Sequence, residues 1–186
     1  MDPNFTSGLI EKLRGRSIFL IGMMASGKSS TGPILAEILK YKYIDLDALI
    51  EKLTKKTIDK IFSEEGEEYF RSLENQCLQE IIKLPSVVVS TGGGVILKKE
   101  NWGVLRQGIV IWLDVNKEVV LRRLHQSKEN ERPLLKGKNI KIMYERIFEI
   151  RKDIYAQADL RVEINNEGVK NIAEKILKAL KKEINN

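Results

Sequence analysis

Residues 17–29 read Ser-Ile-Phe-Leu-Ile-Gly-Met-Met-Ala-Ser-Gly-Lys-Ser, and this stretch decides the fold of the 186-residue chain. Its apolar run ends in a glycine, which is typical of a buried parallel strand. A turn rich in glycine and serine follows, and apolar residues then recur at helical spacing from Ile34 to Leu39. The stretch therefore predicts a strand, a tight turn and a helix in direct succession.

The same alternation of short apolar runs and helical patterns continues to the end of the chain. Parallel strands need long crossover connections, which helices supply. We therefore expect an α/β fold of three layers, in which helices flank a five-stranded parallel sheet. The other strands are predicted at residues 43–45, 86–90, 108–114 and 160–164, and the later helices at 48–53, 57–62, 67–84, 119–125, 140–155 and 169–184.

Length and composition predict one domain. We expect residues 17–186 to form it, after an N-terminal extension at residues 1–16, and the hydrophobic fraction of 42% argues against disorder. Residues 126–139 are polar and aperiodic, so a mobile lid is expected there. No apolar run approaches the roughly 18 residues that a membrane-spanning helix needs, and residues 1–15 lack the apolar core of a secretory signal.

The net charge of +6 raises the question of a polyanionic partner. Lysines and arginines are spread along the chain with acidic residues between them, which favours a solvated surface over a nucleic-acid groove. The lone Cys77 excludes an intramolecular disulfide framework. We expect a monomeric, cytoplasmic protein with no nucleic-acid and no membrane partner.

The segment from Gly22 to Ser29 matches the phosphate-binding pattern G-x-x-x-x-G-K-[ST], the P-loop, in the strand–turn–helix setting that the motif requires. Its glycines let backbone N–H groups turn inward around an anion, and the helix N-terminus adds partial positive charge. Lys28 is expected to reach the β- and γ-phosphates of a nucleotide, and the Ser29 hydroxyl to bind Mg²⁺. The alternative is an ordinary glycine-rich turn.

Two carboxylates, Asp45 and Asp47, follow the second predicted strand, where ligands of a parallel α/β sheet bind. One can hold Mg²⁺ through water, and the other can accept a hydrogen bond from the hydroxyl of an acceptor. Alternatively, Asp47 only caps the helix that begins at Ala48. A generic P-loop interpretation would assign the metal instead to Asp114, after the fourth strand.

Glycines 92–94 end the third strand and predict a close approach of the backbone to a ligand, or else a simple turn. Arg71 stands three residues before Glu74, a spacing that lets Glu74 orient it. With Arg132 and Arg151 it forms a set of side chains suited to binding carboxylates and phosphates bidentately.

Together these motifs resemble those of the shikimate kinases, which phosphorylate the 3-hydroxyl of shikimate with ATP in aromatic amino acid biosynthesis. The resemblance runs from about Ser17 to the C-terminus. It implies Mg²⁺-dependent transfer of the γ-phosphoryl group, giving shikimate 3-phosphate and ADP, on a fold like that of nucleoside monophosphate kinases. It rests on the P-loop, Asp45-x-Asp47, Phe70-Arg71-x-x-Glu74, Thr91-Gly-Gly-Gly94, Arg132-Pro-Leu-Leu135 and Arg151-x-x-x-Tyr155.

The resemblance also implies a role for each site residue. Lys28, Asp47 and Arg132 are the catalytic residues it implies, with Arg132 closing on the phosphates from the lid, while Ser29 and Asp45 hold Mg²⁺. Shikimate is expected to bind to Asp47, Arg71, the backbone of Gly93 and Arg151. ATP is expected to bind to Ala25, Ser26, Gly27, Lys28, Ser29, Ser30, Arg123 and Arg132.

The chain departs from the family pattern at Ala25, where many relatives have glycine, and at Asp153, where proline is usual.

Two other functions remain open. A kinase for another polyol, such as gluconate, would share the P-loop, although the glycines with Arg71 and Arg151 favour a cyclic carboxylate. A non-catalytic, kinase-like binding protein would not need the complete catalytic set.

Overall fold

The computed structural model of the chain describes residues 3–126 and 139–185. Five parallel strands form one sheet in the order β2-β3-β1-β4-β5, so the predicted three-layer α/β fold is confirmed. Every residue of β1 and β3 is buried, because helices cover both faces of the sheet, and this explains their unbroken apolar sequences. The strands are β1 (Ile18–Ile21), β2 (Lys42–Asp45), β3 (Val87–Ser90), β4 (Ile109–Val115) and β5 (Leu160–Ile164).

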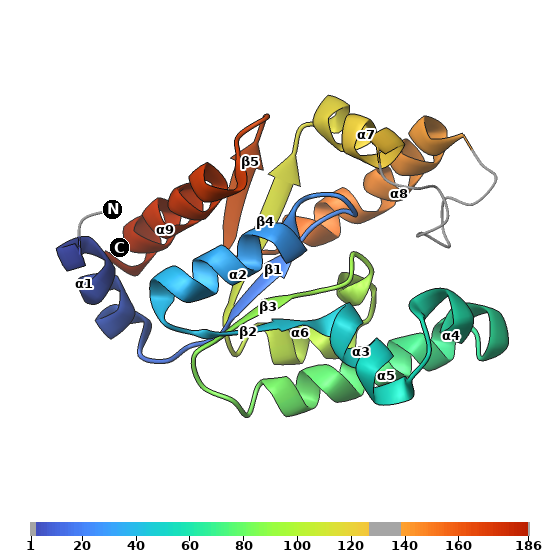
Figure 1. Cartoon of the computed structure of the whole chain (residues 1–186), viewed down its shortest axis with the longest axis horizontal. Helices are drawn as coiled ribbons and strands as arrows, with labels where there is room; N and C mark the ends of the chain where they lie inside the picture. Colours follow the sequence, from blue (N-terminus) through green and yellow to red (C-terminus); the bar gives the residue numbers. More distant parts are fainter. Residues whose placement is uncertain (1–2, 127–138, 186) are drawn as a thin grey trace.

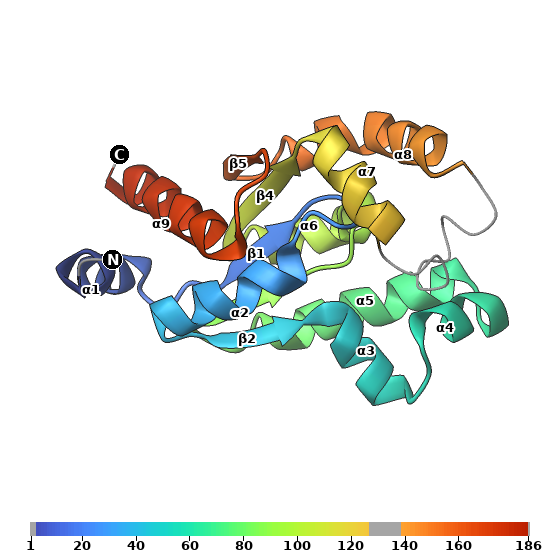
Figure 2. The same cartoon turned by 45° about the horizontal axis from the view of Figure 1, so that its top comes forward.

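Two groups of helices cover the sheet (Figures 1 and 2). One face carries α1 (Pro3–Leu13), α2 (Lys28–Leu39) and α9 (Val169–Asn185), which pack against one another. The other carries α5 (Glu67–Ile81), α6 (Lys99–Leu105) and α8 (Ile140–Tyr155). Shorter helices lie beyond the carboxyl ends of the strands: α3 (Leu46–Thr54) and α4 (Ile58–Glu64) after β2, and α7 (Lys117–Gln126) after β4.

The connections after β1 and β3 run to opposite faces of the sheet. β1 leads into α2, whereas the neighbouring β3 leads through the 3₁₀ turn η1 (Val95–Leu97) into α6 on the other face. Diverging connections between adjacent parallel strands open a crevice beyond their carboxyl ends, where ligands of open α/β sheets bind. The P-loop follows β1 and the glycine triplet follows β3, so the fold brings these two motifs to the same crevice.

Three elements within the described residues were not predicted from the sequence: α1, η1 and α6. The last two are short, and α6 contains Gly103, so neither shows a clear helical repeat in the sequence. Helix α1 lies in the segment that the sequence suggests is an extension, yet its Leu9 and Leu13 are buried in the core. Residues 127–138, which hold Arg132 and nearly all of the predicted lid, lie outside the described residues. In the described part of the chain, no helix is long and apolar enough to cross a membrane.

We predict that Leu13→Ala lowers the free energy of unfolding by about 2–5 kcal/mol, because it leaves a cavity where a fully buried leucine packs α1 onto the core. Urea denaturation measures the change. Ile142→Ala is the control, since 65% of Ile142 is exposed on α8, and it should cost less than about 0.5 kcal/mol. Equal effects of the two substitutions would show that α1 contributes nothing to the fold.

Candidate active site

The phosphate loop between β1 and α2 needs left-handed backbone at several positions. Gly22 has φ +142°, and a Cβ there would lie 2.7 Å from the carbonyl oxygen of Leu113. Gly27 has φ +91° and caps α2. Ala25 has φ +58°, so the residue that stands where many relatives have glycine adopts the conformation that glycine favours. The loop therefore keeps its shape with alanine, at the expense of local backbone strain.

Lys28 lies across this loop rather than out in solvent. Its ammonium donates to the carbonyl oxygens of Gly22 at 2.9 Å and Met23 at 2.8 Å and to the Ser26 hydroxyl at 3.2 Å. The residue is buried, yet it also lines the pocket described below. The geometry therefore anchors a positive charge at the point where the P-loop motif predicts phosphate.

The other residues predicted to bind nucleotide surround the same loop. The guanidinium of Arg123, on α7, donates to the carbonyl oxygen of Ala25 at 3.0 Å, although the two residues are 98 positions apart. Ser29 and Ser30 are exposed on the first turn of α2, and Ser29 lines the pocket. Arg123, which the resemblance places near the adenine base, thus contacts the loop that leads into the first turn of α2.

Asp45, and not Asp47, is the N-cap of α3. Its Oδ1 accepts the Ala48 N–H at 3.2 Å, while its Oδ2 accepts the Tyr43 hydroxyl at 3.3 Å. The alternative interpretation, in which Asp47 merely caps this helix, is wrong, because the helix begins at Leu46 and already includes Asp47 in its first turn. Asp47 is thereby free to take another role.

The carboxylate of Asp47 lines the pocket, and its buried Oδ1 has no hydrogen-bond partner within the described residues. Burial raises the pKa of Asp47 above its usual value, and the nearby charge of Asp45 raises it further, while Lys28 and Arg71 oppose the shift. An acceptor atom that is buried, unpaired and more basic than usual is suited to accept a proton or a hydrogen bond from a bound hydroxyl.

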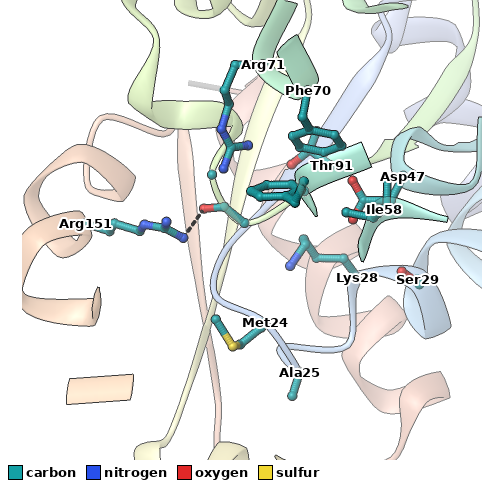
Figure 3. Close-up of a pocket in the computed structure, with 14 residues that line it drawn as sticks. Met24, Ala25, Lys28, Ser29, Asp47, Ile58, Phe70, Arg71, Thr91 and Arg151 are labelled. Carbon is teal, nitrogen blue, oxygen red and sulfur yellow. Dashed lines mark hydrogen bonds between the residues drawn. The ribbon is translucent and has the colours of Figure 1, made fainter. Parts of the chain in front are cut away.

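Arg71 is held from two sides by carboxylates of its own helix, α5. Its Nη1 contacts Glu74 at 2.9 Å, as the sequence spacing predicts, and its Nη2 contacts Glu67 at 3.0 Å. Glu74 is fully buried, and burial raises its pKa to about 7 despite the opposing charge of Arg71. Arg71 therefore faces the pocket in a fixed orientation (Figure 3).

The glycine triplet is needed for close packing against charged side chains. A Cβ on Gly92 would lie 2.9 Å from oxygens of both Asp47 and Glu74, and a Cβ on Gly94 would lie 2.3 Å from Nη2 of Arg71. The predicted close approach of the backbone to a ligand stays a prediction, because the groups that approach it at these two positions belong to the protein. Neither glycine has the positive φ that would mark a left-handed turn.

Arg151 reaches the triplet from α8. Its Nη1 donates to the carbonyl oxygen of Gly93 at 3.0 Å, and the residue is buried (Figure 3). Asp153, the second departure from the family pattern, is exposed on the same helix. The charge introduced at Asp153 therefore does not enter the site.

These groups line one pocket of about 340 Å³, within the size range of small-molecule sites. The sequence did not assign its apolar wall, formed by Met24, Ile58, Phe62 and Phe70. Of these four residues, Phe70 could have been inferred from the sequence as part of the site, because it directly precedes Arg71. The complete lining is Met24, Ala25, Lys28, Ser29, Asp47, Ile58, Phe62, Phe70, Arg71, Thr91, Gly92, Gly93, Gly94 and Arg151.

Asp114, the rival candidate for the metal, is engaged elsewhere. Its Oδ2 accepts two hydrogen bonds from Arg161 of β5, at 2.9 Å from Nε and 2.6 Å from Nη2. Neither Asp114 nor Asp45 lines the pocket, in contrast to Ser29. This arrangement favours Asp45, whose Tyr43 partner also lies 3.5 Å from the carbonyl oxygen of Ser29.

The fold and the site define a P-loop kinase that acts on a small molecule. A family model described as "Shikimate kinase" matches residues 24–181. Curated shikimate kinases of Prochlorococcus marinus are 50% identical (strain SARG) and 51% identical (strain MIT 9313), each over 92% of this chain and over 90% and 89% of their own lengths. The chain belongs to the shikimate kinase family, and phosphorylation of shikimate by ATP, as the sequence implied, is its activity.

Solved structures agree with this assignment. A shikimate kinase from Acinetobacter baumannii in complex with shikimate superposes with a TM-score of 0.88 at 33% identity, over 94% of this chain and 97% of that one. A gluconokinase from Sinorhizobium meliloti gives a TM-score of 0.56 at 20% identity, over 91% and 93% of the two chains, which shows a shared fold alone. The alternative of a gluconate kinase is therefore not supported.

We predict that Glu74 makes stability depend on pH. Because its folded pKa of about 7 lies above its ordinary value of 4.5, the folded state binds more protons than the unfolded state between these pH values, and stability falls as pH rises through that window. Between pH 5 and pH 8 the wild type should therefore lose on the order of 2 kcal/mol more free energy of unfolding than Glu74→Gln.

Urea denaturation at both pH values measures this difference. Glu80→Gln is the matched control, because Glu80 lies on the same helix with 73% of its side chain exposed, and it should behave as the wild type does. Parallel losses in the wild type and in Glu74→Gln would contradict a raised pKa at Glu74.

Proposed function

We propose that the pocket between the P-loop, α5 and the glycine triplet is where the chain transfers the γ-phosphoryl group of ATP to the 3-hydroxyl of shikimate. The observation that supports this most directly is the position of Asp47. Asp47, whose buried Oδ1 has no hydrogen-bond partner among the described residues, lines the same pocket as the P-loop lysine, Lys28, and as two arginines, Arg71 and Arg151. A hydroxyl acceptor with a carboxylate group matches this combination of charges.

On the acceptor side, Arg71 and Arg151 bind the carboxylate of shikimate, together with the backbone of Gly93. Arg71 is oriented by Glu74, and Arg151 by the Gly93 carbonyl, so neither must be ordered when substrate binds. Asp47 orients the 3-hydroxyl and accepts its proton as the O–P bond forms. Its raised pKa makes it a better acceptor at neutral pH than an ordinary aspartate.

On the nucleotide side, the backbone of the loop from Ala25 to Gly27 and the first turn of α2 bind the phosphates. Lys28 neutralises charge on the transferred group, which is the main requirement of phosphoryl transfer. Arg123 orders the loop through Ala25 and faces the nucleotide side. Ser26, Ser29 and Ser30 complete the phosphate site, and Arg132, which lies outside the described residues, stays a prediction of the family resemblance.

Magnesium fits the residues that are present. The described residues contain no cluster of three or more His, Cys, Asp or Glu side chains that could hold an ion by themselves. Mg²⁺ commonly binds through one or two protein oxygens together with substrate phosphates, and the Ser29 hydroxyl and the Asp45 carboxylate supply such oxygens. When bound there with ATP, the ion would neutralise charge on the phosphates and align them.

We further propose that residues 17–186 form one kinase domain onto which α1 packs, and that the protein acts as a cytoplasmic monomer with no nucleic-acid or membrane partner. Neighbouring carboxylates pair with several of the surface lysines, as in Lys56 with Glu64 and Lys117 with Glu145. Acidic side chains therefore stand beside several of the lysines that contribute to the net charge of +6, which supports a solvated surface. The free, buried thiol of Cys77 is compatible with a reducing compartment.

We predict that purified protein releases ADP from MgATP in a manner that depends on shikimate and not on gluconate. A coupled ADP-release assay measures this. Asp47→Asn should lower kcat by about 10²–10⁴-fold, because the hydroxyl loses its proton acceptor while the side chain keeps its size. ADP release that does not respond to shikimate would contradict the proposed acceptor, and no ADP release with either compound would support the non-catalytic alternative.

We predict that Asp45→Asn raises the Mg²⁺ concentration needed for half-maximal activity by about tenfold or more. Asparagine is as good an N-cap as aspartate, so α3 should be retained while the charge is lost. Asp114→Asn is the matched control, and it should leave the Mg²⁺ requirement unchanged because Asp114 pairs with the half-exposed Arg161. A defect confined to Asp114→Asn would move the metal site to β4.

A further inference from the structure

Tyr155, the last residue of α8, is fully buried next to the site but does not line the pocket. The family motif includes this tyrosine, yet the proposed mechanism gives it no role. Its hydroxyl donates to the carbonyl oxygen of Gly93 at 2.6 Å, a short distance for a neutral hydrogen bond. A buried tyrosine thus holds the backbone of the glycine triplet directly.

The same carbonyl oxygen also accepts from Arg151, at 3.0 Å. Arg151 and Tyr155 are four residues apart on α8, so they lie one turn apart on the same face of the helix. Both lone pairs of the Gly93 oxygen are thereby used, and the two donors come from one rigid element. The position of the Arg151 guanidinium and that of the Gly93 backbone are consequently coupled through this oxygen.

The Tyr155 hydroxyl lies close to the phosphate loop as well. It is 3.8 Å from the sulfur of Met23, and a Cβ built on Gly93 would lie 3.4 Å from the Gly22 carbonyl oxygen and 3.6 Å from the Met24 nitrogen. The P-loop and the glycine triplet are therefore in contact at Gly93. Tyr155 contacts both loops at the point where they meet.

Packing fixes the ring of Tyr155. Trp112 of β4 stacks on it, with ring centroids 5.8 Å apart and ring planes 18° apart, and Trp112 is itself buried. A stacked, buried ring has no other rotamer to adopt without opening the core. The hydroxyl is therefore aimed at Gly93 before any substrate arrives.

We propose that Tyr155 is a positioning residue for shikimate: by holding the Gly93 carbonyl, its hydroxyl keeps the Gly93 N–H and the Arg151 guanidinium aligned for the substrate carboxylate. Three consecutive glycines have more conformational freedom than any other tripeptide, and this bond restricts the middle one. The inference rests on the proposed assignment of Gly93 and Arg151 to shikimate.

Tyr155→Phe removes the hydroxyl and keeps the stacked ring. We expect the dissociation constant for shikimate, measured by calorimetry, to rise about five- to tenfold, as for the loss of one buried hydrogen bond. The KM for shikimate should rise in parallel. The dissociation constant for ADP should change by less than about twofold, because among the described residues the hydroxyl meets the phosphate loop at the Met23 sulfur, which has no assigned part in nucleotide binding.

Tyr144→Phe is the matched control. Tyr144 lies on the same helix, is buried to a similar extent and stacks on Phe148 with centroids 6.0 Å apart, but it lines a different pocket, beside Lys117 and Glu145. This variant should leave the affinities for both shikimate and ADP unchanged. If both phenylalanine variants lower stability and neither weakens shikimate binding, Tyr155 has a purely structural role and the inference is wrong.

Arg151→Lys separates this inference from the site assignment on which it rests. If Arg151→Lys leaves shikimate affinity unchanged, the assignment of Arg151 fails. If it weakens shikimate binding and Tyr155→Phe does not, only the role of Tyr155 fails. If Tyr155→Phe does not fold, Trp112→Leu tests the same arrangement, because it removes the ring that stacks on Tyr155. This variant should weaken the binding of shikimate but not the binding of ADP.

Discussion

The parallel pairing of β1 with β3 is the constraint on which the site depends. This pairing sets Leu20 opposite Ser90, so the two strands end at nearly the same level of the sheet. Their loops must then emerge side by side, and the Thr91 hydroxyl strengthens the junction by donating to the Leu20 carbonyl oxygen at 2.9 Å. One loop binds phosphate and the other borders the acceptor pocket, so the distance between the two substrates is set by strand register.

Charge balance is the second constraint on the pocket. Lys28, Arg71 and Arg151 are all largely buried, and each makes hydrogen bonds to backbone oxygens or carboxylates of the protein. Burying a charge without such partners would be costly. The same burial raises the pKa values of Asp47 and Glu74, which share this low-dielectric region. Glu74, which stabilises Arg71, is therefore also a group whose basicity the site raises.

The sequence predicted the features whose signal is local. The P-loop, the five strands and the pairing of Arg71 with Glu74 each depend on residues a few positions apart, and the structure confirms them. The sequence placed the possible cap of this helix at Asp47 and not at Asp45, because the expected helix start at Ala48 lies two residues after the observed start at Leu46. Contacts between distant segments left no local signal, as with Arg161 and Asp114, the burial of α1, or Tyr155 and Gly93.

Ala25 carries a consequence for how the phosphate loop responds to its ligand. An alanine in the left-handed region is strained by roughly 1–2 kcal/mol relative to its right-handed form, whereas a glycine there is not. A glycine would, however, visit many conformations whenever the loop is free. The methyl group of Ala25 removes much of that freedom in advance, and Arg123 secures the chosen form through the Ala25 carbonyl. The loop then loses less conformational entropy when ATP binds. Part of the entropy loss that a glycine loop would show on nucleotide binding therefore occurs in this chain when the protein folds.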